Sequence, residues 1–123
     1  MKISFDFDST LSRKDVQEYC KCLIQDGHDI WITTSRVKEF NGAIHDHTDL
    51  ILVAQTLDIP ENKIHFTNAE FKASYLQLNN FDIHIDDDRF ELERIAKTDV
   101  LDVDVCKDDW KSVICKHIYY NRN

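Results

Sequence analysis

Two aspartates, two positions apart, follow an apolar stretch near the start of the chain, in "ISFDFDSTL" (residues 3–11). Side chains alternate along a β-strand, which predicts that Asp6 and Asp8 share one face while Phe5 and Phe7 share the other. Two carboxylates on one face repel each other, and a metal ion or proton-transfer chemistry is the usual reason for keeping them together. We therefore take the pair as a catalytic candidate, against the simpler interpretation that both acids cap the next helix or face solvent.

The elements that must position these acids alternate along the chain. Apolar character predicts strands at 2–7, 29–36, 63–67, 81–86 and 100–105, the last at a sheet edge. Helical periodicity predicts helices at 12–27, 48–59, 69–78, 88–97 and 108–120, with Ser12, Asn68 and Asp88 as N-caps and Gly27 at a C-terminal end. This alternation is typical of an α/β fold with three layers, a parallel five-stranded sheet carrying helices on both faces.

Polar residues gather where these strands end. Besides Asp6 and Asp8, they occupy positions 33–36, 67–68 and 86–88. In a parallel sheet the carboxyl ends of the strands meet at one edge, where ligands bind beside a reversal in strand order. The sequence therefore predicts an active site at that edge.

Four short motifs, in order, resemble those of the haloacid dehalogenase (HAD) superfamily of phosphatases. "DFDST" (residues 6–10) resembles motif I, DxDx[TV], and "WITTSR" (residues 31–36) resembles motif II. Lys72 in "NAEFKASYL" resembles the motif III lysine, and "IHIDDD" (residues 83–88) resembles motif IV. The resemblance implies a Rossmann-like HAD fold and a phosphohydrolase that forms an aspartyl-phosphate.

The resemblance also assigns roles to the first two acids. Asp6 is the expected nucleophile, since a carboxylate needs no deprotonation at neutral pH. Asp8 is the expected general acid and base, which protonates the leaving oxygen and later deprotonates the attacking water. The dehalogenases of the superfamily lack this second aspartate, so Asp8 favours phosphoryl chemistry.

Mg²⁺ is the cofactor that the resemblance implies, because it prefers oxygen ligands in octahedral geometry. The expected metal-binding residues are Asp6, Asp8 through its backbone carbonyl, Asp86 and Asp87. For Asp87 two roles stay open, a ligand through water or a partner that holds Lys72.

The remaining candidates surround the phosphoryl group. Thr34 is expected to bind the phosphoryl oxygens, with Ser35 in its place if the register shifts by one, and Lys72 to offset negative charge. Lys63 competes for the motif III role, but it precedes its strand and so lies at the other end of the sheet. The expected substrate-binding residues are Thr10, Ser35, Arg36 and His47.

Residues 36–47 form the longest segment predicted to be irregular, and we expect it to act as lid and specificity element. The chain has no room for a full cap domain, so the resemblance is to a small capless member, of phage type or similar to 5'-nucleotidases. The expected substrate is a small nucleotide or a nucleic-acid-end phosphate. For His45 and His47, metal binding and a role in holding a substrate phosphate both stay open.

Composition bounds these expectations. The 123 residues predict one domain spanning 1–123, 42% of them hydrophobic, with a formal charge of −8 that disfavours non-specific nucleic-acid binding. No apolar run is long enough for a membrane, and no signal peptide is evident, so a cytoplasmic location is expected. The final helix, with Tyr119 and Tyr120, either supports a homodimer or completes the core.

Two other functions compete with a phosphatase. A signalling receiver domain also forms an aspartyl-phosphate, but its acceptor aspartate ends the third strand, and here that strand ends "HFTN" without an acid. A non-catalytic HAD-like protein that binds a partner or a nucleotide is the other alternative.

Overall fold

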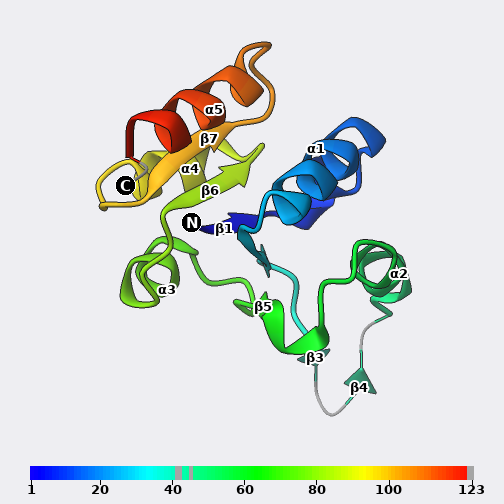
Figure 1. The fold of residues 1–123 in the computed structure, drawn as a ribbon. Coiled ribbons are helices and arrows are strands. Elements are labelled where there is room, and N and C mark those ends of the chain that lie inside the picture. Colours follow the sequence, from blue (N-terminus) through cyan, green and yellow to red (C-terminus); the bar gives the residue numbers. More distant parts are fainter. Residues whose placement is uncertain (41–42, 45, 122–123) are drawn as a thin grey trace.

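A computed structural model of the chain describes residues 1–40, 43–44 and 46–121. Five parallel strands, β1 (Lys2–Phe5), β2 (Asp29–Thr34), β5 (Ile64–Phe66), β6 (Ile83–Asp86) and β7 (Leu101–Asp104), form one sheet (Figure 1). Its helices are α1 (Lys14–Gln25), α2 (Thr48–Thr56), α3 (Ala73–Leu78), α4 (Arg89–Ile95) and α5 (Trp110–Asn121). The predicted α/β class with a parallel five-stranded sheet is confirmed.

The strands lie in the order β5-β2-β1-β6-β7. Numbered along the sheet by their sequence rank, this is 3-2-1-4-5, the order of Rossmann-like sheets. The direction of strand succession reverses between β1 and β6, and the crevice at such a reversal is where open α/β sheets bind ligands. Strand β7 lies at an edge, as predicted.

Helices cover both faces of the sheet (Figure 1). On one face, apolar strand residues such as Ile3, Phe5 and Ile85 pack with buried residues of α1, α2 and α5. On the other face, Trp31 packs against a smaller cluster that includes Leu76 of α3 and Ile95 of α4. The result is the predicted arrangement of three layers.

Strand β1 ends at Phe5, two residues earlier than predicted. The next residues form a tight turn, η1 (Phe7–Leu11), in which Ser9 has a φ of 58°. The expectation that Asp6 and Asp8 share a strand face is therefore wrong, because the chain leaves the sheet between them.

Local hydrogen bonds explain which predicted caps form. Ser12 does not cap α1, since turn η1 occupies the preceding residues and the helix starts only at Lys14. Asn68, with a φ of 55°, does not cap α3, which begins five residues later. Asp88 does cap α4, accepting from the backbone N–H groups of Phe90 and Glu91.

Residues 36–47 are more regular than predicted. They contain two short antiparallel strands, β3 (Glu39–Phe40) and β4 (Ala43–Ile44). His45 lies outside the described residues. Elsewhere, a 3₁₀ turn η2 (Glu61–Lys63) leads into β5, and Gly27, with a φ of 91°, follows the end of α1 as predicted.

In the part of the chain that the structure describes, no helix combines the length and apolar character needed to span a bilayer. The side chains of Tyr119 and Tyr120 are exposed and pack edge-to-face on each other, so they do not complete the core. The homodimer and the cytoplasmic location stay predictions.

Candidate active site

Three aspartates meet at the carboxyl ends of β1 and β6, the strands that flank the reversal. Asp6 directly follows β1, and its N–H donates to the carbonyl of Ile85 over 2.9 Å, which extends the strand pairing by one residue. Asp86 ends β6, and Asp87 follows it. One carboxylate oxygen from each of Asp6, Asp86 and Asp87 lies within 4.8 Å of the other two, close enough for a shared cation.

Lys72 lies buried among these acids, only 2% exposed. Its Nζ donates to Asp6 Oδ1 over 2.8 Å and to Asp86 Oδ2 over 2.6 Å, and lies 3.7 Å from Glu91 Oε2. Burial alone lowers the pKa of Lys72, but the Asp6 and Asp86 carboxylates outweigh it and the pKa is raised. Lys72 therefore stays cationic, one positive charge among several carboxylates.

The electrostatics of Asp6 and Asp86 differ. Burial, together with the neighbouring Asp86 and Asp87, outweighs Lys72 and raises the pKa of Asp6 to about 8. Burial also acts to raise the pKa of Asp86, but hydrogen bonds from His84 and Lys72 hold it below its ordinary value. Without further positive charge Asp6 therefore takes up a proton near neutral pH, and a cation beside it favours the carboxylate.

Both oxygens of Asp86 are fully engaged. Oδ2 accepts from Lys72 Nζ and, over 2.7 Å, from His84 Nε2. Oδ1 accepts from the backbone N–H groups of Asp87 and Asp88, over 2.9 and 3.1 Å. Since each carboxylate oxygen offers about two acceptor positions, a cation reaches Asp86 only by replacing one of these donors, whereas Asp6 and Asp87 are the more available ligands.

A buried polar layer beneath the acids is absent from the sequence-based expectations. His84 is fully buried, and Ser4 and Thr33 share a hydrogen bond of 2.6 Å between their hydroxyls. His84 is paired with Ser4 in the sheet and lies on the same face as Asp86, two positions along β6. The sequence does indicate this arrangement: in "IHID" His84 lies two positions before Asp86, and residues two apart on a strand share a face.

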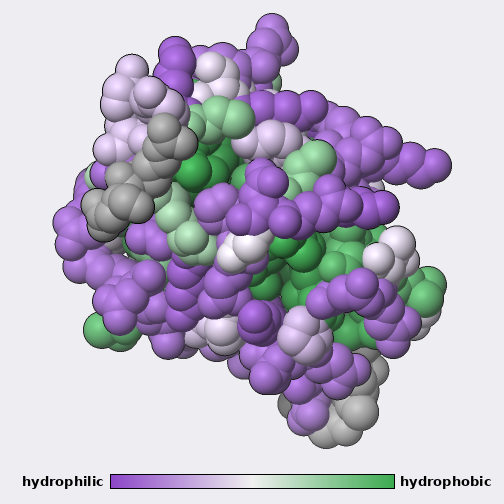
Figure 2. Space-filling model, in the orientation of Figure 1, coloured by the Kyte–Doolittle hydropathy of each residue, from purple (hydrophilic) through white to green (hydrophobic). Residues whose placement is uncertain are grey.

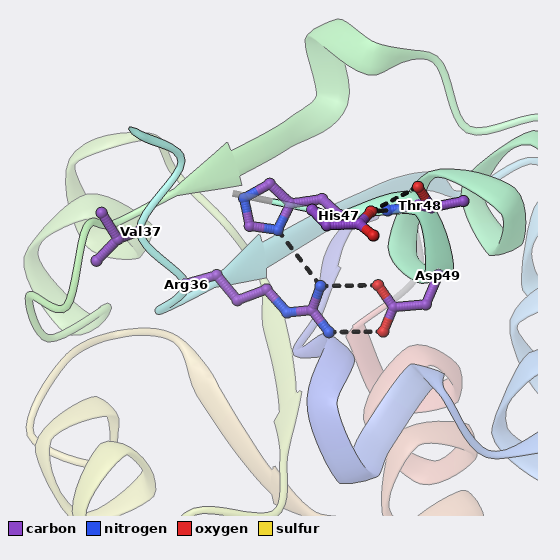
Figure 3. Close-up of a pocket in the computed structure, with 6 residues that line it drawn as sticks. Arg36, Val37, His47, Thr48 and Asp49 are labelled. Atoms are coloured by element: carbon purple, nitrogen blue, oxygen red, sulfur yellow. Dashed lines mark hydrogen bonds and ion pairs between the residues drawn. The ribbon is translucent and has the colours of Figure 1, made fainter. Parts of the chain in front are cut away.

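Asp8 is not one of the three clustered aspartates, and its carboxylate pairs with Arg36. Arg36 Nε donates to Asp8 Oδ2 over 2.9 Å and Nη2 to Oδ1 over 2.7 Å. The same guanidinium forms two hydrogen bonds with Asp49, of 2.9 and 2.8 Å, and Nη1 lies 3.4 Å from His47 Nδ1 (Figure 3). Asp49, at the start of α2, is a second residue that sequence reasoning missed.

The other expected site residues take different positions. Buried Thr10 donates to Asp87 Oδ1 over 3.1 Å, so it orients a candidate metal ligand. Thr34 is buried and accepts from the Arg36 N–H, and Ser35 is exposed beyond the strand. Among the described residues, no hydrogen bond joins Thr34 or Ser35 to Asp6 or Lys72, so their contact with a phosphoryl group stays a prediction.

The structure shows where Lys63 and Lys72 lie and which aspartate holds Lys72. Lys63 precedes β5 and pairs with Asp29 at the start of β2, which is the opposite end of the sheet from Asp6. Lys72 is held by Asp86, while Asp87 accepts from Thr10. Glu91, 6% exposed and also in contact with the Lys72 backbone N–H, is a further acid that the sequence did not single out.

Comparison of the chain with protein-family models, with curated proteins and with solved structures found no match.

Proposed function

We propose that this chain is a Mg²⁺-dependent phosphomonoester hydrolase, a capless member of the HAD superfamily that works through an aspartyl-phosphate on Asp6. One observation carries the proposal: Asp6, Asp86 and Asp87 converge within 4.8 Å at the strand-order reversal, with Lys72 buried between two of them. The four motifs that suggested this family lie far apart in the sequence, and three of them contribute residues to this one cluster. The cytoplasm is its proposed location.

The donor set fits a hard divalent cation. All three candidate ligands are carboxylates, two of them buried, and Lys72 is the cation that the structure places among them. Asp6 and Asp87 would hold Mg²⁺ directly, with Asp86 and the backbone carbonyl of Asp8 as further ligands. When bound, Mg²⁺ supplies the positive charge that lets a phosphate dianion approach these acids.

The residues of the chain carry the two chemical steps. Asp6 attacks phosphorus, the bond from phosphorus to the ester oxygen breaks, and Asp8 gives that leaving oxygen a proton. Asp8 then takes a proton from water, whose oxygen attacks phosphorus and displaces Asp6, releasing inorganic phosphate. Lys72 offsets negative charge on Asp6 and the transferred group throughout, and Arg36 orients the Asp8 carboxylate.

The strand order disfavours the receiver-domain alternative. Receiver-like sheets have the order 2-1-3-4-5, whereas this sheet has 3-2-1-4-5. The third strand in sequence rank, β5, is here an edge strand and lies two strands away from Asp6. A non-catalytic HAD-like binding protein is the remaining alternative, and activity decides between the two.

The deciding experiment is a phosphatase screen of the purified chain over nucleotides, sugar phosphates and 3'- or 5'-phosphorylated oligonucleotides. We expect phosphate release with Mg²⁺ and none with EDTA, and we expect Asp6→Asn to remove turnover while the protein stays folded. Absence of Mg²⁺-dependent release from every compound, with folded protein, would favour the binding-protein alternative.

A further inference from the structure

Two adjoining hollows open around His47 and Thr48. The Arg36 hollow, of about 610 Å³, is lined by Arg36, Val37, Asp46, His47, Thr48 and Asp49 (Figure 3). The Phe66 hollow, of about 550 Å³, has the apolar lining residues Ile51, Leu52, Ile64 and Phe66. Both include Asp46, His47 and Thr48, so the two hollows adjoin, and we refer to them together as the groove. Each volume is in the usual range for small-molecule sites, roughly 300–1,000 Å³.

Arg36 links the groove to the proposed general acid. Arg36, which lines the first hollow, contacts both carboxylate oxygens of Asp8. In the proposed reaction Asp8 protonates the leaving oxygen, so the leaving group extends from Asp8 over Arg36 toward the Phe66 hollow. This direction of the leaving group rests on the proposed function. It makes the Phe66 hollow a candidate binding site for the leaving group.

The Phe66 hollow suits a flat aromatic ring. The Phe66 and His47 rings lie 4.7 Å apart at 44°, and Lys38 Nζ lies 5.8 Å from the centre of the Phe66 ring. Leu52 is 57% exposed on α2, a large apolar side chain left open to a ligand. Figure 2 shows apolar surface framed by polar side chains on the side where Figure 1 places α2. Aromatic rings of ligands stack well on such surfaces.

The charged residues of the groove select an uncharged leaving group. Asp46, Asp49 and Glu61 carry three negative charges, against two positive charges on Arg36 and Lys38. This net negative charge disfavours a further phosphate, as in a nucleoside triphosphate or an oligonucleotide. Carboxylates do accept hydrogen bonds from hydroxyl and amino groups, which a neutral sugar and base provide.

We propose that the groove binds the nucleoside part of a nucleoside monophosphate, with the base in the Phe66 hollow and the sugar over Arg36. A nucleoside combines the three required properties: a flat aromatic ring, hydroxyl and amino donors, and no charge. An oligonucleotide end shares the base but brings additional phosphates into an acidic groove.

The binding test needs no catalysis. Adenosine or uridine is titrated into ¹⁵N-labelled protein, and backbone amide shifts are followed by NMR, with ribose as the control ligand. We expect either nucleoside to shift amides around Thr48, Ile51 and Phe66, and ribose to leave them unchanged. Shifts confined to other regions, or none at millimolar nucleoside, would overturn the proposal whatever the enzyme hydrolyses.

The kinetic test compares adenosine 5'-monophosphate with ribose 5-phosphate, which differ only by the base. We expect the nucleotide to be favoured in kcat/KM, and Phe66→Leu to reduce that preference about tenfold, as expected for a lost stacking contact. Phe90→Leu, at an exposed phenylalanine on α4, is the matched control and leaves the preference unchanged. If Phe66→Leu fails to fold, Leu52→Lys takes its place; it changes an exposed residue that lines the same hollow and should likewise reduce the preference.

The two tests separate this inference from the proposed function. Nucleoside binding at the Phe66 hollow without phosphatase activity would sustain the site and reject the hydrolase. Hydrolysis of ribose 5-phosphate as fast as the nucleotide, or a preference for phosphorylated oligonucleotides, would reject the nucleoside site and sustain the hydrolase.

Discussion

Arg36 forms a two-pronged hydrogen-bonded ion pair with Asp8, in which Nε and Nη2 each contact one carboxylate oxygen, over 2.9 and 2.7 Å. Asp49 accepts two more hydrogen bonds from the same guanidinium and so fixes its orientation. The Asp8 side chain is 59% exposed, so the pair contributes little to stability, below about 1 kcal/mol. Its consequence in the proposed mechanism is to position the general acid and base.

Arg36→Lys separates positioning from stability. Lysine keeps the positive charge but cannot contact both Asp8 oxygens at once, so we expect kcat to fall about tenfold with little change in the melting temperature. Asp8→Asn, which removes the proton carrier itself, should lower kcat by about 10² or more. Wild-type kcat in folded Arg36→Lys would show that Arg36 does not position Asp8.

Lys72→Met tests the charge balance among the buried acids. Removing the Lys72 cation leaves Asp6 and Asp86 buried without their partner. Deleting one half of a buried ion pair destabilises proteins by about 3–5 kcal/mol, so we expect a loss of this size. Since a divalent cation offsets the same charges, Mg²⁺ should raise the melting temperature of the variant more than that of the wild type. Thermal melts in EDTA and in Mg²⁺ measure this, and equal melting of both proteins in EDTA would contradict it.

His84→Leu tests the support beneath the candidate metal site. His84 Nε2 contacts Asp86 Oδ2 over 2.7 Å from a fully buried position, so its loss frees Asp86 to reorient. We expect the Mg²⁺ concentration for half-maximal activity to rise about 10–100-fold, as for other residues that orient metal ligands. His84→Gln, which keeps a donor at this position, should retain more of the affinity. Calorimetric Mg²⁺ titrations that match the wild type would reject this role.

The pH dependence of the metal-free protein tests the protonation of Asp6. Its pKa is raised from 3.8 to about 8 by burial beside Asp86 and Asp87, against the opposing charge of Lys72. Between these values the folded chain keeps a proton that the unfolded chain has lost, so the free energy of unfolding falls as pH rises.

The informative window for this effect is pH 6.5–8. Burial lowers the pKa of His84 below 6.5. Titration of His84 therefore makes the free energy of unfolding rise with pH, but only at pH values below this window. Denaturation in EDTA should show stability falling across the window, and Asp6→Asn should remove the slope. A wild-type slope of zero or of opposite sign would show that Asp6 is ionised without metal.

Much of the scaffold could be predicted because strand and helix periodicities are local. The alternation of apolar segments gave the five parallel strands and the edge position of β7, and Asp88 capped its helix as expected. Local turns were harder to predict from the sequence. Positive φ values occur at Ser9 in the turn after β1 and at Asn68 before α3. Asparagine adopts this conformation more readily than most residues, whereas nothing local marks Ser9.

For the site as well, residues in local motifs could be predicted and residues brought in by packing could not. Asp6, Lys72 and Asp86 could be selected because each belongs to a motif at a predicted strand or helix end. The partners Asp49, His84 and Glu91 depend on how elements pack, which one sequence does not specify. His84 and Glu91 contact Asp86 and Lys72 of the buried cluster, and Asp49 holds the guanidinium that pairs with Asp8.

The most direct test of the central claim is chemical identification of the phosphorylated residue. Wild-type protein turning over a phosphomonoester with Mg²⁺ is quenched in acid, digested and mapped by mass spectrometry. We predict a phosphoryl group on the peptide that contains Asp6, and none in EDTA or in Asp6→Asn. A phosphoryl group on another residue, or turnover that continues in Asp6→Asn, would contradict the account.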